Sequence, residues 1–173
     1  ENRFLVSEGV EIYYFTAHKV GVLFSTALFK ALQRHAAEFD VLHTHNVFHP
    51  LNQYAGRVGK RFGLPIFFHI HGSLDPGVVQ KGFLKSIKKK LFLTLFEIPT
   101  LRKAAGIFAI SQDEAEQIRQ LLPKVPVHFL PNGTVLPAIS PKVEDKLVKL
   151  VIIGRVHPKK GLHHLLAALR EVV

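Results

Sequence analysis

The sequence predicts an α/β fold built on a doubly wound parallel sheet. Short apolar runs alternate along the chain with segments in which apolar residues recur at helical spacing. The apolar runs are nearly free of polar residues, which is typical of strands that helices cover on both faces. Strands and helices that alternate in this order favour a parallel sheet, whose ligands bind beyond the carboxyl ends of the strands.

The first third of the chain is expected to contain two strand–helix pairs. Residues 1–9 are typical of the end of a helix, and the β-branched and aromatic run that follows predicts a strand over 10–16. Apolar residues at helical spacing predict a helix over 22–39, and a short apolar run predicts a strand over 40–45. The segment 50–63 opens with a proline and closes with a glycine, the usual asymmetry of a helix.

The middle of the chain continues the alternation. An apolar run predicts a strand over 65–70, and a long basic segment predicts a helix over 81–97, which Pro99 is expected to interrupt. The next strand is expected at 106–111, and a further strand with a turn at 125–133.

The helix between these last two strands carries a capping box. Ser111 is expected to accept a hydrogen bond from the amide of Glu114, while the Glu114 side chain reaches back to the amide of Ser111. This pattern predicts that the helix begins directly after Ser111.

A linker is expected before a second domain begins. Residues 136–148 contain prolines, no periodicity and a charge cluster, whereas a new apolar strand over 147–154 and a helix follow. We therefore expect an α/β domain at 1–135, the linker at 136–148 and the start of a second α/β domain at 149–173. Both ends of the sequence are typical of cut domains, so we expect a fragment of a longer protein.

Composition excludes several classes of protein. The sequence has 173 residues, of which 47% are hydrophobic and none is cysteine, so it is globular and has neither disulfides nor thiolate metal sites. No apolar run reaches the roughly 18–20 residues of a membrane-spanning helix. The formal net charge of +10 favours an anionic partner, which can be a nucleic acid, an anionic membrane surface or a phosphorylated ligand.

Four histidines lie in pairs at the carboxyl ends of two predicted strands. Spacing of two places His43 and His45 on one face of a strand, and the same holds for His69 and His71. A zinc site of four imidazoles is geometrically conceivable, but the acidic or cysteine ligand common in such sites is missing nearby. The alternative is that the histidines are hydrogen-bonded at a crowded sheet edge. The position of His71 favours a functional role for this residue, because it precedes Gly72. A glycine allows its backbone to lie close to a ligand.

The loop that follows, residues 71–76, offers amide and hydroxyl donors from Gly72 and Ser73. A plain turn explains the same residues equally well. A Ser-His-Asp hydrolase is the weaker interpretation because the sequence contains no Gly-x-Ser-x-Gly motif.

The basic helix is expected to carry two neighbouring surfaces. One is a stripe of lysines that aromatic residues extend, formed by Lys81, Lys85, Lys88, Lys89 and Phe92. The other is an apolar arc that includes Ile87, Leu91 and Leu95. Basic residues beside aromatic ones suit an anionic membrane surface. A solvated lysine face on a core helix is an equal alternative, and no known motif supports a nucleic-acid interface.

The stretch 154–161 joins the last predicted strand to the last helix and concentrates positive charge. Gly154, Arg155 and Lys160 precede the helix N-terminus, where amides and the helix dipole favour an anion. The stretch is neither a Walker loop nor a Gly-x-Gly-x-x-Gly motif. A phosphate site and a bare surface loop are equally good interpretations of these residues alone.

Four stretches together resemble the retaining glycosyltransferases of family 4, which have the GT-B fold of two facing Rossmann-like domains. They occur in the family's order: FDVLHTHNVFHP, PIFFHIHGSLDPG (the subgroup form with Leu-Asp-Pro), RKAAGIFAISQDEAEQI with VHFLPNGT, and LVIIGRVHPKKGLHHLLAAL. The resemblance implies an incomplete N-terminal Rossmann-like domain, followed by the first strand and helix of the donor domain. The family's glycine-rich first strand and its Glu-x7-Glu motif are not in the sequence, so we expect no turnover by the chain alone.

The resemblance also implies roles for the matching positions. His71 corresponds to the active-site histidine near the transferred sugar, with Gly72 and Ser73 beside the sugar-phosphate. Arg155 and Lys160 correspond to the pair that neutralises the donor diphosphate. Cationic side chains then take over the task of a metal ion, so no metal and no other cofactor is expected.

The expected reaction moves a hexosyl group from a nucleotide-sugar donor to a glycan or lipid-linked acceptor with retention, in polysaccharide or glycoconjugate synthesis. The resemblance implies a cytoplasmic protein that lies peripherally on the inner face of the membrane and has no nucleic-acid partner. The alternative is a basic α/β module that binds nucleic acid or an anionic membrane without catalysis. The sugar, the nucleotide and the acceptor stay open at this stage.

Overall fold

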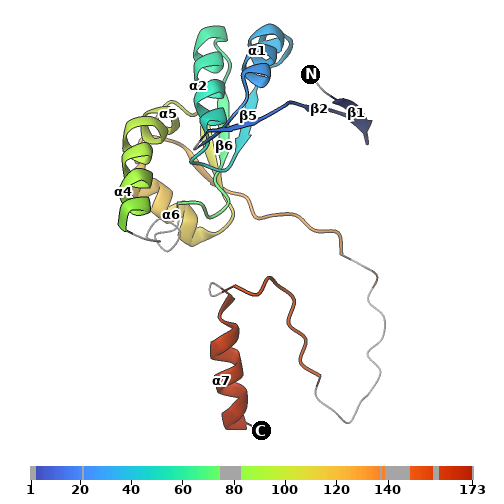
Figure 1. Cartoon of the computed structure of the whole chain (residues 1–173), viewed down its shortest axis with the longest axis vertical. Coiled ribbons are helices and arrows are strands. Elements are labelled where there is room, and N and C mark those ends of the chain that lie inside the picture. Colours follow the sequence, from blue (N-terminus) through green and yellow to red (C-terminus); the bar gives the residue numbers. More distant parts are fainter. Residues whose placement is uncertain are drawn as a thin grey trace. The chain divides into compact units, whose positions relative to one another are not determined.

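The structure, a computed structural model, describes residues 3–20, 22–74, 83–136, 138, 149–157 and 160–172. The chain divides into two compact units, Glu1–Thr134 and Val135–Val173. Figure 1 labels elements of both units. Among the described residues, no helix combines the length and apolar character needed to cross a membrane.

The first unit is organised around a four-stranded parallel sheet. Its strands, hydrogen-bonded in this order, are β5 (Leu42–His45), β6 (Ile66–His69), β7 (Gly106–Ala109) and β8 (Val127–Phe129). The register aligns Leu42 with Ile66 and Phe68 with Ile107. The sheet confirms the predicted α/β class, and each strand lies within the range that its apolar run predicts.

The helices of this unit begin and end where the local sequence favours it. Their bounds are α1 (Thr26–His35), the 3-10 turn η1 (Ala36–Glu38), α2 (Pro50–Phe62) and α6 (Gln112–Leu121). The Ser25 hydroxyl accepts a hydrogen bond from the Leu28 amide at 3.2 Å, which caps α1. Pro50 occupies the first turn of α2, and Gly63 ends this helix with a left-handed φ of 71°. Helices α1 and α2 lie side by side (Figure 1).

The basic segment continues as a helix past Pro99. Its elements are α4 (Phe83–Phe92), the π-helical turn η2 (Leu93–Glu97) and α5 (Ile98–Leu101). In the π turn the amide of Ile98 donates to the carbonyl of Leu93. Pro99 then occupies the first turn of α5. A proline is tolerated there, because the amide N–H that it lacks has no partner within the first turn of a helix. The predicted interruption at Pro99 is therefore wrong, because the widened turn accommodates the proline.

One face of the sheet forms the core, and the other is largely open among the described residues. Phe68 and Ile107 are fully buried and share their core with Val58 of α2 and Ile118 of α6. Alternate strand residues point to the opposite face, where histidine and phenylalanine rings are mostly half-buried or exposed. This arrangement differs from the expectation that both faces are covered.

Two antiparallel hairpins stand near the start of the chain. They are formed by β1 (Arg3–Ser7) with β2 (Val10–Tyr14), and by β3 (His18–Val20) with β4 (Val22–Phe24). The strand predicted over 10–16 is confirmed, but residues 3–7 form a strand rather than the end of a helix. Glu8 and Gly9 both have positive φ, 50° and 80°, which is the backbone that a two-residue hairpin turn requires. The helix predicted over 22–39 begins only after the second hairpin.

The second unit contains a helix, α7 (Leu162–Val172), at the predicted place. The strand predicted over 147–154 is wrong for residues 149–154, which the structure describes as irregular. Ile152 and Ile153 are 51% and 94% exposed, and the described part of this unit offers no neighbouring strand to pair with them. Most of the expected linker at 136–148 lies outside the described residues, and the domain boundaries stay predictions.

Candidate active site

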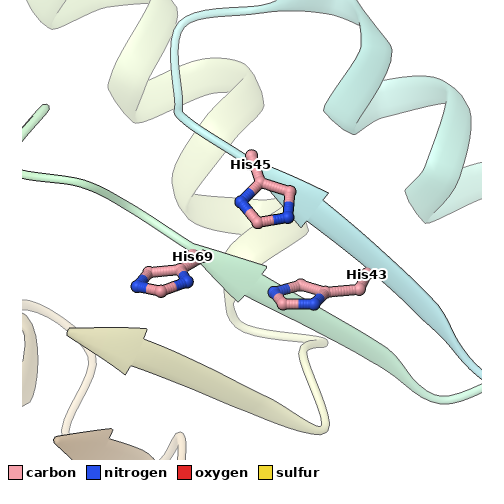
Figure 2. Close-up of side chains that lie close together, drawn as sticks. All are labelled: His43, His45 and His69. Carbon is pink, nitrogen blue, oxygen red and sulfur yellow. The ribbon is translucent and has the colours of Figure 1, made fainter. Parts of the chain in front are cut away.

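The carboxyl ends of β5 and β6 bring three histidines together. His43 and His45 stand on one face of β5, and the strand register places His45 beside His69 of β6. One ring nitrogen of each residue lies within 4.8 Å of the others. Figure 2 shows the three rings gathered over the ends of the two strands.

His71, just beyond the end of β6, joins this group through its ring. Its Nε2 lies 2.9 Å from Nδ1 of His45, a hydrogen bond. Its ring stacks on that of His69 with the centroids 4.0 Å apart. The two pairs expected from the sequence are therefore one continuous group, called here the histidine cluster (His43, His45, His69 and His71).

Two rings of the cluster are held in the neutral form. Loss of water around the ring lowers the pKa of His43 below 6.5, and the nearby His45 and His71 lower it further. Burial also lowers the pKa of His69, as do the three other histidines, while Glu114 acts in the opposite direction. At neutral pH both rings are uncharged, and each has one nitrogen with a free lone pair.

The backbone at the end of the cluster has an uncommon conformation. His71 and Gly72 have φ of 55° and 70°. A left-handed residue other than glycine costs about 1–3 kcal/mol and persists only where its surroundings enforce it. The Ser73 amide donates to the carbonyl of Ile70 at 3.3 Å and closes the turn. No atom of the described residues lies within 4 Å of the position that a Cβ would take on Gly72, which leaves room for a ligand on that side. Residues 75–76 lie outside the described residues.

Glu114 of α6 holds this turn. Its buried carboxylate accepts one hydrogen bond from the Gly72 amide and a second, 2.8 Å long, from the Ile110 amide. The Ser111 hydroxyl accepts from the Glu114 amide at 3.1 Å, as the capping box predicts. The expected return bond to the Ser111 amide is replaced by the two others, because the carboxylate reaches the end of β7 and the neighbouring turn instead. The Gly72 amide is therefore used internally, whereas the Ser73 hydroxyl has no hydrogen-bond partner among the described residues.

A second buried carboxylate supports the loop after β5. Glu97 is fully buried and accepts from the His49 amide at 3.2 Å and from Asn52 Nδ2 at 3.4 Å. Asn52 also donates to the carbonyl of Asn46, which has a left-handed φ of 67°. Burial raises the pKa of Glu97 above 4.5, although hydrogen bonds from His49, Asn52 and Phe48 act in the opposite direction. No local sequence pattern marks Glu97, because only the fold brings the basic helix to this loop.

The cationic stretch predicted to bind phosphate lies in the second unit. Arg155 and Lys160 are exposed. The Lys160 amide donates to the carbonyl of His157 at 2.8 Å, and its side-chain Cδ lies 4.0 Å from the position of a Cβ on Gly154. Gly154 and Lys160 are thus neighbours in space. That Arg155 and Lys160 act together with His71 stays a prediction.

The basic helix presents its apolar arc to solvent. Ile87, Leu91 and Leu95 are 47%, 56% and 55% exposed. Lys88 and Lys90 are exposed beside them. This arc does not pack into the core that the described residues form, so it provides an apolar surface bordered by positive charge.

The predicted lysine stripe is less uniform than expected. Lys89 is half-buried, and its Nζ lies 5.7 Å from the ring centroid of Phe48. Phe92 is half-buried against Phe96, with ring centroids 5.4 Å apart. Lys81 and the side chain of Lys85 lie outside the described residues. The stripe that joins all four lysines to Phe92 therefore stays a prediction, and the fold turns one of its members, Lys89, towards the loop after β5.

A groove of about 270 Å³ lies between β2 and α1, away from the histidine cluster. It is lined mainly by apolar side chains, among them Tyr13, Phe15 and Leu32. No histidine of the cluster lines it, so we do not include it in the candidate active site.

Comparison with known proteins identifies the family. A family model described as a glycosyl transferase 4-like domain matches residues 2–133. A search of curated proteins found no match. The matched range includes the parallel sheet, the histidine cluster and both buried glutamates, and such a domain implies a sugar donor and an acceptor as substrates. The chain therefore belongs to the glycosyl transferase 4-like family.

Proposed function

We propose that this protein transfers a hexosyl group from a nucleotide-sugar to a glycan or lipid-linked acceptor, with retention of the anomeric configuration, in polysaccharide or glycoconjugate synthesis. The proposal depends most on the strained turn at His71 and Gly72, which Glu114 holds at the carboxyl ends of parallel strands. Ligands of such sheets bind beyond these ends. Strained backbone of this kind is common at ligand sites.

The turn supplies the contacts to the transferred sugar in this proposal. A ring nitrogen of His71 donates to or accepts from a sugar hydroxyl. The open space over Gly72 admits the sugar-phosphate, and the Ser73 hydroxyl is within the same turn to bind it. His45 positions His71 through the bond between their rings.

The leaving diphosphate is neutralised by Arg155 and Lys160. Both are exposed cations, and Lys160 lies beside Gly154, a residue without a side chain that would block access. Positive groups aimed at the leaving oxygen stabilise the charge that develops in the transition state. These side chains perform the task for which other transferases use a metal ion.

In this proposal the apolar arc of the basic helix, which spans α4 and η2, contacts the cytoplasmic face of an anionic membrane. Ile87, Leu91 and Leu95 provide the apolar contact, and Lys88 and Lys90 provide the attraction to acidic headgroups. A lipid-linked acceptor is presented at that surface. This assignment accounts for an apolar surface that the described core leaves uncovered.

A transfer assay tests the proposed reaction. The full-length protein is incubated with radiolabelled uridine- and guanosine-diphosphate sugars, and the anomeric configuration of the product is read by proton NMR. We expect a retained configuration and loss of transfer in His71→Ala. The control is His128→Ala, whose exposed ring lies on β8 outside the cluster. An inverted product, or full transfer by His71→Ala, would contradict the proposal.

A further inference from the structure

We propose that the histidine cluster is also a binding site for a divalent transition-metal ion such as Zn²⁺, with His43, His45 and His69 as ligands. The site shares His45 and His71 with the sugar-binding turn proposed above, but it does not involve Arg155 and Lys160, which neutralise the diphosphate in that proposal. Metal binding is measured without the transfer reaction, so failure of one proposal is distinguishable from failure of the other.

The positions of the ring nitrogens carry this inference. One nitrogen from each of the three residues lies within 4.8 Å of the other two. In a tetrahedral zinc site with Zn–N distances of about 2.0–2.1 Å, the ligand nitrogens are roughly 3.4 Å apart. His43 and His45 are exposed, so their side chains can rotate by the small amount that this contraction requires.

His69 supplies the fixed member of the site. It is only 7% exposed, and its Nε2 is buried without a hydrogen-bond partner among the described residues. A buried polar atom without a partner is unfavourable and uncommon. The ring is also held by stacking on His71 and by contact with Phe108, at centroid distances of 4.0 Å and 6.0 Å. His69 therefore offers a rigid, buried imidazole to the two exposed ones.

His71 acts as a positioning residue for the metal site. Histidines that bind a metal through one nitrogen usually donate a hydrogen bond from the other. His45 meets this condition when it binds through Nε2, because its Nδ1 lies 2.9 Å from Nε2 of His71. The bond then fixes the tautomer of His45 and the orientation of its ring.

The ligand set selects the class of ion. Imidazole nitrogens suit Zn²⁺, Cu²⁺ and Ni²⁺, whereas Mg²⁺ and Ca²⁺ require oxygen ligands. Both carboxylate oxygens of Glu114, which holds the turn, already accept backbone hydrogen bonds. A site of three imidazoles with an exposed side also leaves a coordination position for water.

Isothermal titration of ZnCl₂ into the purified whole chain tests the site. We expect one saturable Zn²⁺ per chain and no heat of binding with MgCl₂. The His43→Ala/His45→Ala double variant should lose this event, whereas His128→Ala should keep it. His71→Asn should retain the stoichiometry and weaken the affinity by about 10–100-fold. Cobalt substitution gives a second reading, since Co²⁺ in a tetrahedral nitrogen site absorbs strongly in the visible range.

Two results would overturn the proposal. One is the absence of saturable Zn²⁺ binding by the wild-type chain. The other is undiminished binding by the double variant, since the ion would then be held by other histidines. Circular dichroism checks that the variants are folded. If the double variant is not folded, His43→Gln takes its place. A Zn²⁺ affinity of this variant within about tenfold of that of the wild type would also overturn the proposal.

Discussion

The carboxylate of Glu114 accepts a hydrogen bond from the amide of Gly72, a residue that lies 42 positions earlier in the chain. The same carboxylate accepts from the amide of Ile110, at the end of β7. One buried side chain on α6 thus connects two strand ends and holds the residue that follows His71. The position of the candidate catalytic histidine depends on this helix.

Glu114→Gln is expected to lower both stability and sugar transfer. Two amides donate to the carboxylate, but a glutamine has one acceptor oxygen, so one amide loses its partner at a cost of about 1–3 kcal/mol. Urea unfolding measures the change. Glu116→Gln is the matched control because Glu116 is exposed on the same helix, and its effect should stay within about 0.5 kcal/mol. Equal effects of the two substitutions would show that Glu114 does not hold the turn.

Glu97 should make stability depend on pH in a specific direction. Burial raises its pKa above 4.5, so the folded chain binds this proton more tightly than the unfolded chain. The stability that Glu97 contributes is therefore fully present below pH 4.5 and is lost as the pH rises through the raised pKa.

The matched variant for this prediction is Glu97→Gln, which does not titrate. The free energy of unfolding of the wild type, relative to that of the variant, should fall as the pH rises from acid to neutral. Urea unfolding at a series of pH values provides the measurement. A difference that is constant with pH, or that grows as pH rises, would disagree with a raised pKa.

Gly59→Ala is expected to destabilise the protein although alanine favours helices. The position of the new Cβ lies 2.6 Å from Cγ1 of Ile66 and 3.1 Å from the carbonyl oxygen of Leu64. Ile66 is buried in the core and cannot move away freely. Overpacking typically costs about 1–3 kcal/mol, which exceeds the gain of up to about 1 kcal/mol in helix propensity. Thermal unfolding measures the effect. Lys60→Ala, at the exposed neighbouring position, serves as the control. A Gly59→Ala variant as stable as the wild type would exclude close packing of α2 on β6.

Arg155→Ala and Lys160→Ala should each reduce transfer strongly. Removal of a group that stabilises developing negative charge typically lowers kcat by about 10²–10³-fold. Lys159→Ala is the control, since the resemblance gives this neighbour no role. The measurement is release of nucleoside diphosphate by the full-length protein. If Arg155→Ala releases nucleoside diphosphate as fast as the wild type, Arg155 does not neutralise the donor diphosphate.

Replacement of Ile87, Leu91 and Leu95 by serine should weaken binding to membranes. All three side chains are exposed, so the fold should be retained while the apolar contact is lost. Co-sedimentation with vesicles that contain an anionic phospholipid measures binding, which should also weaken with salt. The control is Phe39→Ser, at an exposed apolar position elsewhere in the first unit. If the wild-type protein does not bind anionic vesicles but binds DNA in a salt-dependent way, the result would support a nucleic-acid-binding module instead.

Much of the architecture follows from patterns within short segments. Apolar runs and helical spacing predict the parallel strands and most helices, because both depend on which neighbouring residues can be buried together. Pro50 with Gly63 marks the ends of α2, and Ser111 marks the start of α6. A period of two also suffices to place His43 with His45 on one face.

Long-range pairing settles the remaining features, and no local pattern contains that information. The register of β5 on β6 places His45 beside His69 and turns two separate pairs into one cluster. Glu114 and Glu97 acquire their roles because distant helices pack against the strand ends and bury a carboxylate there. Burial of charge and the sharing of backbone hydrogen bonds depend on which segments meet in space, so these residues can be recognised only after the sheet is assembled.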